Sequence, residues 1–144
     1  MTHGGPTQEV ARRVKELRGK RRLTGAQLAE RMTEAGIRWD RSIVANLEGG
    51  RRHTVSVAEL LALALVLNVA PVHLLVDPDD GEAGYQVTPA VTAGRASVRA
   101  WIRGTDPIDP DADLREFRSE VPKDEFYLDK HFVRGDKAGT DDPR

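Results

Sequence analysis

The segment from Asp40 to Gly50, DRSIVANLEGG, has two faces of different chemistry. Asp is a preferred residue at helix starts and Gly at helix ends, so the segment predicts one short helix. Its inward face has three apolar residues at helical spacing, Ile43, Val44 and Leu47. A solvated helix usually carries Lys and Glu on its other face, but this one carries Arg41, Ser42, Ala45 and Asn46. Such a face is low and rich in hydrogen-bonding groups, which suits close contact with a polar partner.

Four more helices are predicted in the first 76 residues, each from an apolar stripe that follows a start signal. The start signals are, in chain order, Thr7, the capping box Thr24–Gln27, the capping box Ser56–Glu59 and Pro71. The most apolar of these helices, VAELLALALVL, is expected to end at Asn68. No strand-like alternation occurs in residues 7–76. This part of the sequence therefore predicts a compact all-α domain of five short helices.

Three segments of this domain follow one another in a characteristic order: LTGAQLAERM, DRSIVANLEGGRR and AELLALALVLNVAPVHLL. In this order they resemble the Cro/C1-type (XRE-like) helix-turn-helix repressor family. The resemblance implies a five-helix lambda-repressor-like DNA-binding domain, with the helix between Asp40 and Gly50 in the major groove of double-stranded DNA. There, Arg can bond guanine and Asn can bond adenine. The implied base-contacting residues are Arg41, Ser42 and Asn46. A phosphate or water contact is an equal alternative for Asn46.

The resemblance also implies phosphate contacts and one structural ion pair. The phosphate contacts lie at the start of the second helix and just after Gly50, at Thr24, Gly25, Gln27, Arg51 and Arg52. Arg18, late in the first helix, is expected to pair with Glu48. One segment departs from the family pattern, because MTEAGIRWD makes the turn before Asp40 several residues longer. Either the second helix is extended or the turn bulges, with Trp39 packed at its end.

Composition limits the class of protein. The 144 residues contain no cysteine, which excludes disulfides and thiolate metal sites. The start, MTHGGPTQEVARR, lacks the apolar core of a signal peptide. The most apolar run, from Leu60 to Val76, is interrupted by Asn68, Pro71 and His73, whereas a membrane span needs about 20 near-continuous apolar residues. We therefore expect a soluble, cytoplasmic protein.

The nearly neutral overall charge conceals two halves of opposite sign. Residues 1–76 hold 12 Lys and Arg against 7 Asp and Glu, a net charge of +5. Residues 77–144 hold 10 against 16, a net charge of −6, together with six of the seven aromatic residues. A purely solvating tail is usually poor in aromatic residues. The two halves are therefore expected to have different partners, and the second half to fold or to dock on something.

The second half is predicted to contain a linker, an extension and a tail. Residues 77–92 form the linker, because Pro, Gly and acidic residues in DPDDGEAG cannot support a core. Residues 93–134 form the extension, with one short helix ended by Gly104 and another capped by Asp113. Residues 135–144 form a disordered tail. The first of these helices carries a stripe that could neutralise the acidic tail or contact DNA: Arg95, Arg99 and Arg103.

No arrangement of residues indicates catalysis, a metal or another cofactor. The four histidines lack ligand spacing, and no Ser/His/Asp set or pair of catalytic carboxylates can be argued. Four acidic residues match a calcium loop, at positions 109, 111, 113 and 120. Leu114, however, stands where that loop needs its turn glycine. Asp-Pro loops that lead into a capped helix produce this pattern without calcium.

We therefore expect a non-enzymatic, sequence-specific DNA-binding transcriptional regulator, a repressor that binds an inverted-repeat operator as a homodimer. The alternative is a protein-interaction module, antitoxin-like or an adaptor, whose acidic and aromatic extension binds a partner. The two functions can coexist, since a partner or effector bound to the extension could tune the DNA affinity of the first half.

Overall fold

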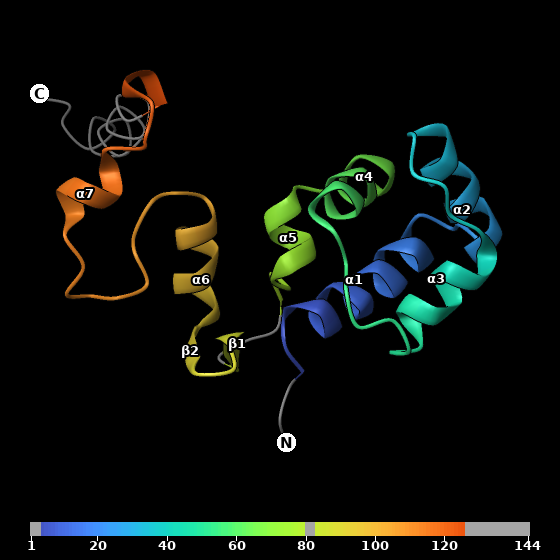
Figure 1. Cartoon of the computed structure of the whole chain (residues 1–144), viewed down its shortest axis with the longest axis horizontal. Helices are drawn as coiled ribbons and strands as arrows, with labels where there is room; N and C mark the ends of the chain where they lie inside the picture. Colours follow the sequence, from blue (N-terminus) through green and yellow to red (C-terminus); the bar gives the residue numbers. More distant parts are fainter. Residues whose placement is uncertain (1–3, 80–82, 126–144) are drawn as a thin grey trace, which may run out of the picture.

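The structure, a computed structural model, describes residues 4–79 and 83–125 (Figure 1). Five helices come first: α1 (Pro6–Lys20), α2 (Gly25–Glu34), α3 (Arg41–Glu48), α4 (Val57–Leu67) and α5 (Pro71–Leu75). An antiparallel hairpin follows, β1 (Gly84–Thr88) and β2 (Val91–Gly94), and then α6 (Arg95–Ile102) and α7 (Leu114–Arg118). We call residues 83–125 the C-terminal module. Its hairpin and α6 lie beside α1 and α5 (Figure 1).

The five predicted helices are present and share one core. The large side chains with no exposed surface come from all five: Val14, Leu28, Met32, Leu47, Leu63, Leu67 and Leu74. Burial of each such side chain stabilises the fold by about 1.5–3 kcal/mol relative to an exposed position. Because α3 contributes Val44 and Leu47 to this core, its opposite face must point toward solvent.

The predicted helix ends are mostly correct. Both capping boxes form, and Asp40 caps α3. Asn68 ends α4 in the left-handed conformation, with φ of 52°. The prediction of Thr7 as the first cap is wrong, because α1 begins at Pro6 and Gly5 is its cap. The fixed φ of proline suits the first helical position, where the missing N–H removes no helical hydrogen bond.

The long segment between α2 and α3 is a turn and not an extension of α2. The helix ends at Glu34, and the chain then turns with Gly36 at φ +95°. The Ile37 N–H donates to the carbonyl of Met32 at 2.9 Å. Trp39 is buried at the end of the turn, as the sequence predicted, and only 6% of its surface is exposed. The start of α3 is therefore held by a packed indole.

The predicted linker over residues 77–92 contains a strand, so the chain is not all-α after the helical domain. Tyr85 in β1 pairs with Ala93 in β2. The Pro, Gly and acidic composition that predicted a linker describes only its first residues. The alternation of Tyr85 and Val87 with polar neighbours was the strand signal, and it is short enough to be overlooked.

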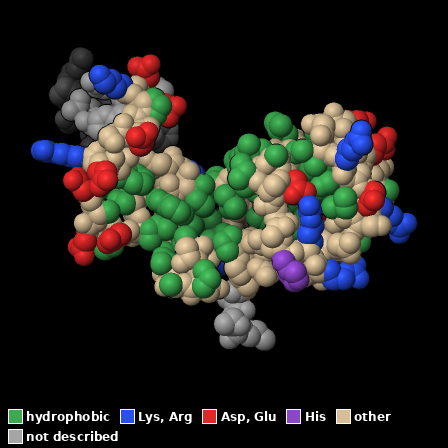
Figure 2. All heavy atoms as spheres, viewed as in Figure 1, with side chains coloured by type: hydrophobic (Ala, Val, Ile, Leu, Met, Phe, Trp, Pro, Cys, Tyr) green, Lys and Arg blue, Asp and Glu red, His purple; other side chains and the backbone are tan. Residues whose placement is uncertain are grey.

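The opposite charges of the two halves are visible on the surface. In Figure 2, Asp and Glu side chains gather over the C-terminal module, whereas most of the Lys and Arg side chains in view lie, with some Asp and Glu among them, over the end formed by α2 and α3. That end is the one at which the field of the protein would attract an anionic partner.

A second, small core joins the C-terminal module to the helical domain. Tyr85, Val76 and Val98 are buried together. The Tyr85 hydroxyl donates a hydrogen bond to the carbonyl of Leu75 at 2.8 Å. Burial, with a smaller contribution from the Glu9 carboxylate, raises the pKa of Tyr85 to about 12. The hydroxyl therefore stays protonated at neutral pH and remains a donor.

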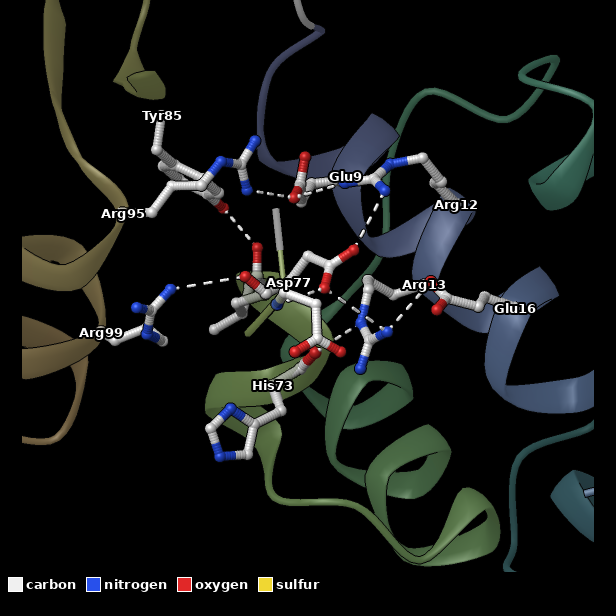
Figure 3. Close-up of polar contacts among 11 residues, drawn as sticks. Glu9, Arg12, Arg13, Glu16, His73, Asp77, Tyr85, Arg95 and Arg99 are labelled. Carbon is white, nitrogen blue, oxygen red and sulfur yellow. Dashed lines mark hydrogen bonds and ion pairs between the residues drawn. The ribbon is translucent and has the colours of Figure 1, made fainter. Parts of the chain in front are cut away.

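Ion pairs and hydrogen bonds that connect α1, Asp77 and the module surround this core (Figure 3). Arg95 Nη1 lies 2.6 Å from Glu9 Oε1, and the two side chains are only 1% and 6% exposed. Arg12 joins Glu9 to Asp77, with N–O distances of 2.8 and 3.1 Å. Arg99 Nη1 donates to the Asp77 carbonyl at 3.4 Å. The arginine stripe of α6 thus faces the helical domain. The sequence predicted that this stripe neutralises the acidic tail or contacts DNA. Neither use describes Arg95, because its carboxylate partner, Glu9, lies on α1.

Asp77 should make the stability of this arrangement depend on pH. Burial alone would raise its pKa, but the Asp79 N–H and the guanidinium groups of Arg13 and Arg12 outweigh burial and lower it. A carboxyl with a lowered pKa stabilises the fold above its unfolded pKa, and this contribution is lost as the pH falls through the folded pKa. The free energy of unfolding should therefore fall below about pH 4. Between pH 5 and pH 2 (about the limits of the transition), the Asp77→Asn variant should lose less of its free energy of unfolding than wild type does. Urea denaturation at the two pH values measures both losses. Equal losses would contradict this role.

The rest of the module was partly predicted. Asp113 caps α7 by accepting bonds from the N–H groups of Arg115 and Glu116, and Gly104 follows α6 at φ +80°. The predicted tail, residues 135–144, and the end of the predicted extension lie outside the described residues. Over residues 4–79 and 83–125, no helix has the length and apolarity to cross a membrane. In the same ranges, no group of three His, Asp or Glu side chains could hold a metal ion.

Candidate nucleic-acid interface

The outward face of α3 lies open to solvent. Its four residues are all exposed: Arg41, Ser42, Ala45 and Asn46. They present one cation, one hydroxyl and one amide, and none of them is acidic. A surface of this kind does not repel phosphate groups, and its two small side chains let the helix backbone come close to a partner.

Local hydrogen bonds fix both ends of α3. The Asp40 carboxylate accepts a bond from the Ile43 N–H at 3.0 Å. At the other end, the Asn46 carbonyl accepts bonds from the N–H groups of Arg51 and Arg52, each at 3.0 Å. Gly50 has φ of +77°, in the left-handed region that favours glycine. The exposed face is therefore presented by a helix whose first and last turns are held.

The expected ion pair between Arg18 and Glu48 is present and has two hydrogen bonds. Arg18 Nε and Nη2 donate to the two oxygens of Glu48 at 2.7 and 2.9 Å. Arg18 Nη1 also donates to the carbonyl of Leu23 at 2.9 Å. The hydrogen bonds to Glu48 outweigh burial and raise the pKa of Arg18. One guanidinium thus fixes the end of α3 against α1 and against the segment that leads to α2.

The start of α2 is a closed capping box. Thr24 Oγ1 accepts from the Gln27 N–H at 3.1 Å, and Gln27 Oε1 accepts from the Thr24 N–H at 2.8 Å. Both residues are exposed, and Gly25 between them is half-buried. The box uses these two side-chain oxygens as acceptors, so the donors that this end can offer a ligand are the Thr24 hydroxyl, the Gln27 amide NH₂ and the first N–H groups of the helix.

The two predicted phosphate-contacting arginines after α3 lie in different environments. Arg51 is exposed. Arg52 is half-buried, and its Nη2 lies 2.6 Å from Glu59 Oε2. Its guanidinium carbon also lies 5.3 Å from the centroid of the Trp39 ring, within the range of a cation–π interaction. The Arg52 guanidinium is therefore bound to other groups of the protein, whereas the Arg51 side chain is exposed to solvent.

Glu59 connects three elements, and the sequence did not reveal this role. Its carboxylate accepts the Ser56 N–H in the capping box and the Trp39 Nε1–H at 2.8 Å, and it pairs with Arg52. Burial alone would raise its pKa, but these bonds outweigh burial and lower it. The capping pattern predicted only the first bond, because Trp39 and Arg52 come to the carboxylate from other parts of the chain. The long turn before α3 is thereby tied to α4.

These features define a class of protein. A capped helix with an exposed face that carries a cation, preceded by a second helix and a turn, is the arrangement found in helix-turn-helix DNA-binding domains. A family model described as a helix-turn-helix domain matches residues 9–75. The chain belongs to the Cro/C1-type (XRE-like) helix-turn-helix family through this domain. The match ends before the C-terminal module.

Comparison with solved structures finds a similar protein, the restriction-modification controller protein C.AhdI from Aeromonas hydrophila, known from a high-resolution crystal structure. The two sequences are 34% identical, and the match covers 47% of this chain and 94% of the other, with a TM-score of 0.40. No curated protein matched the sequence.

Proposed function

We propose that this protein is a sequence-specific transcriptional regulator, a repressor that binds an inverted-repeat operator as a homodimer. The observation that carries the proposal is the exposed and low face of α3, held in place by the Asp40 cap and the Arg18–Glu48 pair. In the complex, α3 lies in the major groove. Arg41 and Ser42, in its first turn, face the base edges, and Asn46 faces a base or the adjacent phosphate.

Phosphate contacts position the domain on either side of α3. At the start of α2, Thr24, Gly25 and Gln27 contact a phosphate through the helix N–H groups and the Gln27 amide. After α3, the exposed Arg51 contacts the opposite side of the groove. For Arg52 to contact a phosphate, its side chain has to turn outward, because Nη2 is bound to Glu59 and Nη1 is buried.

Repression follows from occupancy. Two copies related by a two-fold axis place their α3 helices in successive turns of the major groove, so the operator has two inverted half-sites about 34 Å apart. A dimer bound across a promoter blocks access of the polymerase. The alternative function, partner binding by the C-terminal module, is compatible with this one, since Trp101 and Leu114 are exposed there.

Selection of bound sequences from a random pool of duplex DNA tests the proposal directly. The expected product is a motif with inverted symmetry, bound with an affinity that falls steeply as salt is added, because phosphate contacts release counterions. Selection that enriches no sequence would reject sequence-specific regulation. Enrichment of a single motif without symmetry would reject the dimeric arrangement.

The Arg41→Ala variant is expected to lose about 1–3 kcal/mol of binding free energy to the selected operator, and to lose it at one base position in each half-site. Its fluorescence anisotropy titrations against operators changed at each position should show that preference disappear. The matched control is Arg51→Ala, which removes an equal charge but should weaken binding to all sequences alike. Identical specificity of Arg41→Ala and wild type would contradict the placement of α3 in the groove.

A further inference from the structure

Two arginines of α6 have no carboxylate partner, although acidic side chains gather over the module that contains them (Figure 2). Arg99 lies in α6, and Arg103 ends this helix one turn later. Within residues 4–79 and 83–125, neither forms an ion pair, whereas Arg95 of the same stripe pairs with Glu9. Like charges one helical turn apart repel each other. We call Arg99 and Arg103 the α6 arginine pair.

The hydrogen bonds of the α6 arginine pair are few and long. Arg99 Nη1 donates to the Asp77 carbonyl at 3.4 Å, and Arg103 Nη2 lies 3.4 Å from His73 Nε2. An ordinary N–H···O hydrogen bond is about 2.7–3.2 Å long. Because a guanidinium carries several N–H groups, most donors of the pair have no acceptor among the residues that the structure describes. These donors are therefore open to a ligand that supplies acceptors.

Both side chains reach toward the end of α5, so their charges gather at one place. Figure 3 shows Arg99 extending from α6 toward Asp77, which follows α5, and the ring of His73 projecting from α5. Burial lowers the pKa of this histidine, and three guanidinium groups lower it further: Arg103, Arg13 and Arg99. The ring is therefore neutral at neutral pH, and the positive charge beside it belongs to the arginines.

The acidic groups near the α6 arginine pair leave its charge uncompensated. The Asp77 carboxylate accepts its hydrogen bonds from other residues. Glu120 and Glu125 line a groove together with Arg103, yet neither forms an ion pair with it. Within the described part of the chain, two guanidinium charges thus stand one helical turn apart without a counter-ion. An anion bound there would remove their repulsion.

We propose that the α6 arginine pair binds a phosphate group, either as inorganic phosphate or as the monoester of a small molecule. A phosphate dianion offers acceptor oxygens only, and its charge balances that of two guanidinium groups. Arginine binds phosphate through two parallel N–H···O bonds, for which both members of the pair have unused donors. A carboxylate carries a single charge and would leave the repulsion partly in place.

This site lies outside the proposed DNA surface. The α6 arginine pair belongs to the C-terminal module, whereas the match to the helix-turn-helix family ends at residue 75. The proposal therefore does not depend on DNA binding, and it can be tested without DNA. A chain that binds phosphate at α6 but selects no DNA sequence would contradict the regulator and leave the phosphate site standing.

Titration of inorganic phosphate into the ¹⁵N-labelled full chain tests the site, with sodium chloride keeping the ionic strength constant. The Nε–H signals of Arg99 and Arg103 should shift together along one saturating curve. In the Arg103→Gln variant, the dissociation constant read from Arg99 should rise at least about 10-fold, because hydrogen bonds between charged groups are lost. Arg103 is exposed, so this variant should keep the circular dichroism spectrum of wild type. The matched control is Arg118→Gln, at an exposed arginine of α7, which should leave the dissociation constant unchanged.

Three results would overturn the proposal: an Arg99 signal that follows no saturating curve, the same dissociation constant in Arg103→Gln and wild type, or an equal loss of affinity in Arg118→Gln. An acidic group of the chain itself that occupied the pair would give the first result, because it would compete with phosphate. Phosphate bound at the α3 surface would shift the Arg51 signal along a separate curve, so the two surfaces are distinguished.

Two further arms identify the source of the phosphate and the mode of binding. Tighter binding of glycerol phosphate than of inorganic phosphate would assign the site to an ester, and the reverse order would assign it to the free ion. The Arg103→Lys variant keeps the charge but lacks the planar fork, so it should bind phosphate more weakly than wild type. Equal binding by this variant and wild type would overturn the paired guanidinium bonds on which the site depends.

Discussion

The Trp39→Ala variant is expected to lose about 3–5 kcal/mol of its free energy of unfolding, the range for a buried tryptophan. The indole is 6% exposed, and its Nε1–H donates to Glu59 at 2.8 Å. The ring also lies under the Arg52 guanidinium. Removing it leaves a cavity beneath the turn that leads into α3, and it breaks the connection between that turn and α4.

Urea denaturation followed by far-ultraviolet circular dichroism measures this loss. The matched control is Trp39→Phe, which keeps an aromatic ring but removes the donor to Glu59 and should cost less, with about 1–1.5 kcal/mol from the lost hydrogen bond. A Trp39→Ala variant within 1 kcal/mol of wild type (about the error of such a comparison) would mean that the turn is not held by the indole.

The Arg95→Ala variant is expected to destabilise the packing of the C-terminal module by about 3–5 kcal/mol, because it removes one of the two guanidinium partners of the buried Glu9 carboxylate. Arg95 and Glu9 are nearly fully buried, and the guanidinium also lies 5.5 Å from the centroid of the Tyr85 ring. Arg12 still pairs with Glu9 in this variant, so the loss should lie at the lower end of that range.

Two controls separate the weakened pairing of the Glu9 carboxylate from simple loss of packing. Arg99→Ala removes an arginine of the same stripe whose bond, to the Asp77 carbonyl at 3.4 Å, is long, and it should cost less than about 1 kcal/mol. The double variant Glu9→Met with Arg95→Met fills the space without charge and should recover most of the loss in urea denaturation. If Arg95→Ala and Arg99→Ala were equally stable, the buried Arg95–Glu9 pair would not be what holds the module to α1. A double variant no more stable than Arg95→Ala would show that packing, and not the carboxylate, explains the loss.

The amino-acid sequence by itself determined the helical domain and the direction in which α3 faces. Caps such as Asp40 and the two capping boxes act on N–H groups two or three residues away, so the residues that form them are adjacent in the chain. Apolar stripes repeat every three or four residues for the same reason. These local signals placed Val44 and Leu47 inward and left Arg41 outward.

The tertiary structure alone decided which of these cations are free to meet a partner. Arg51 and Arg52 are neighbours in sequence, yet only Arg52 is bound, because its partner Glu59 and the Trp39 ring are brought to it by packing. Glu9 and Arg95 are 86 residues apart, and no spacing in the sequence connects them. An ion pair depends on distance in space, which the chain reaches only after its core has formed. Helix caps, in contrast, depend on neighbours that the chain already holds together.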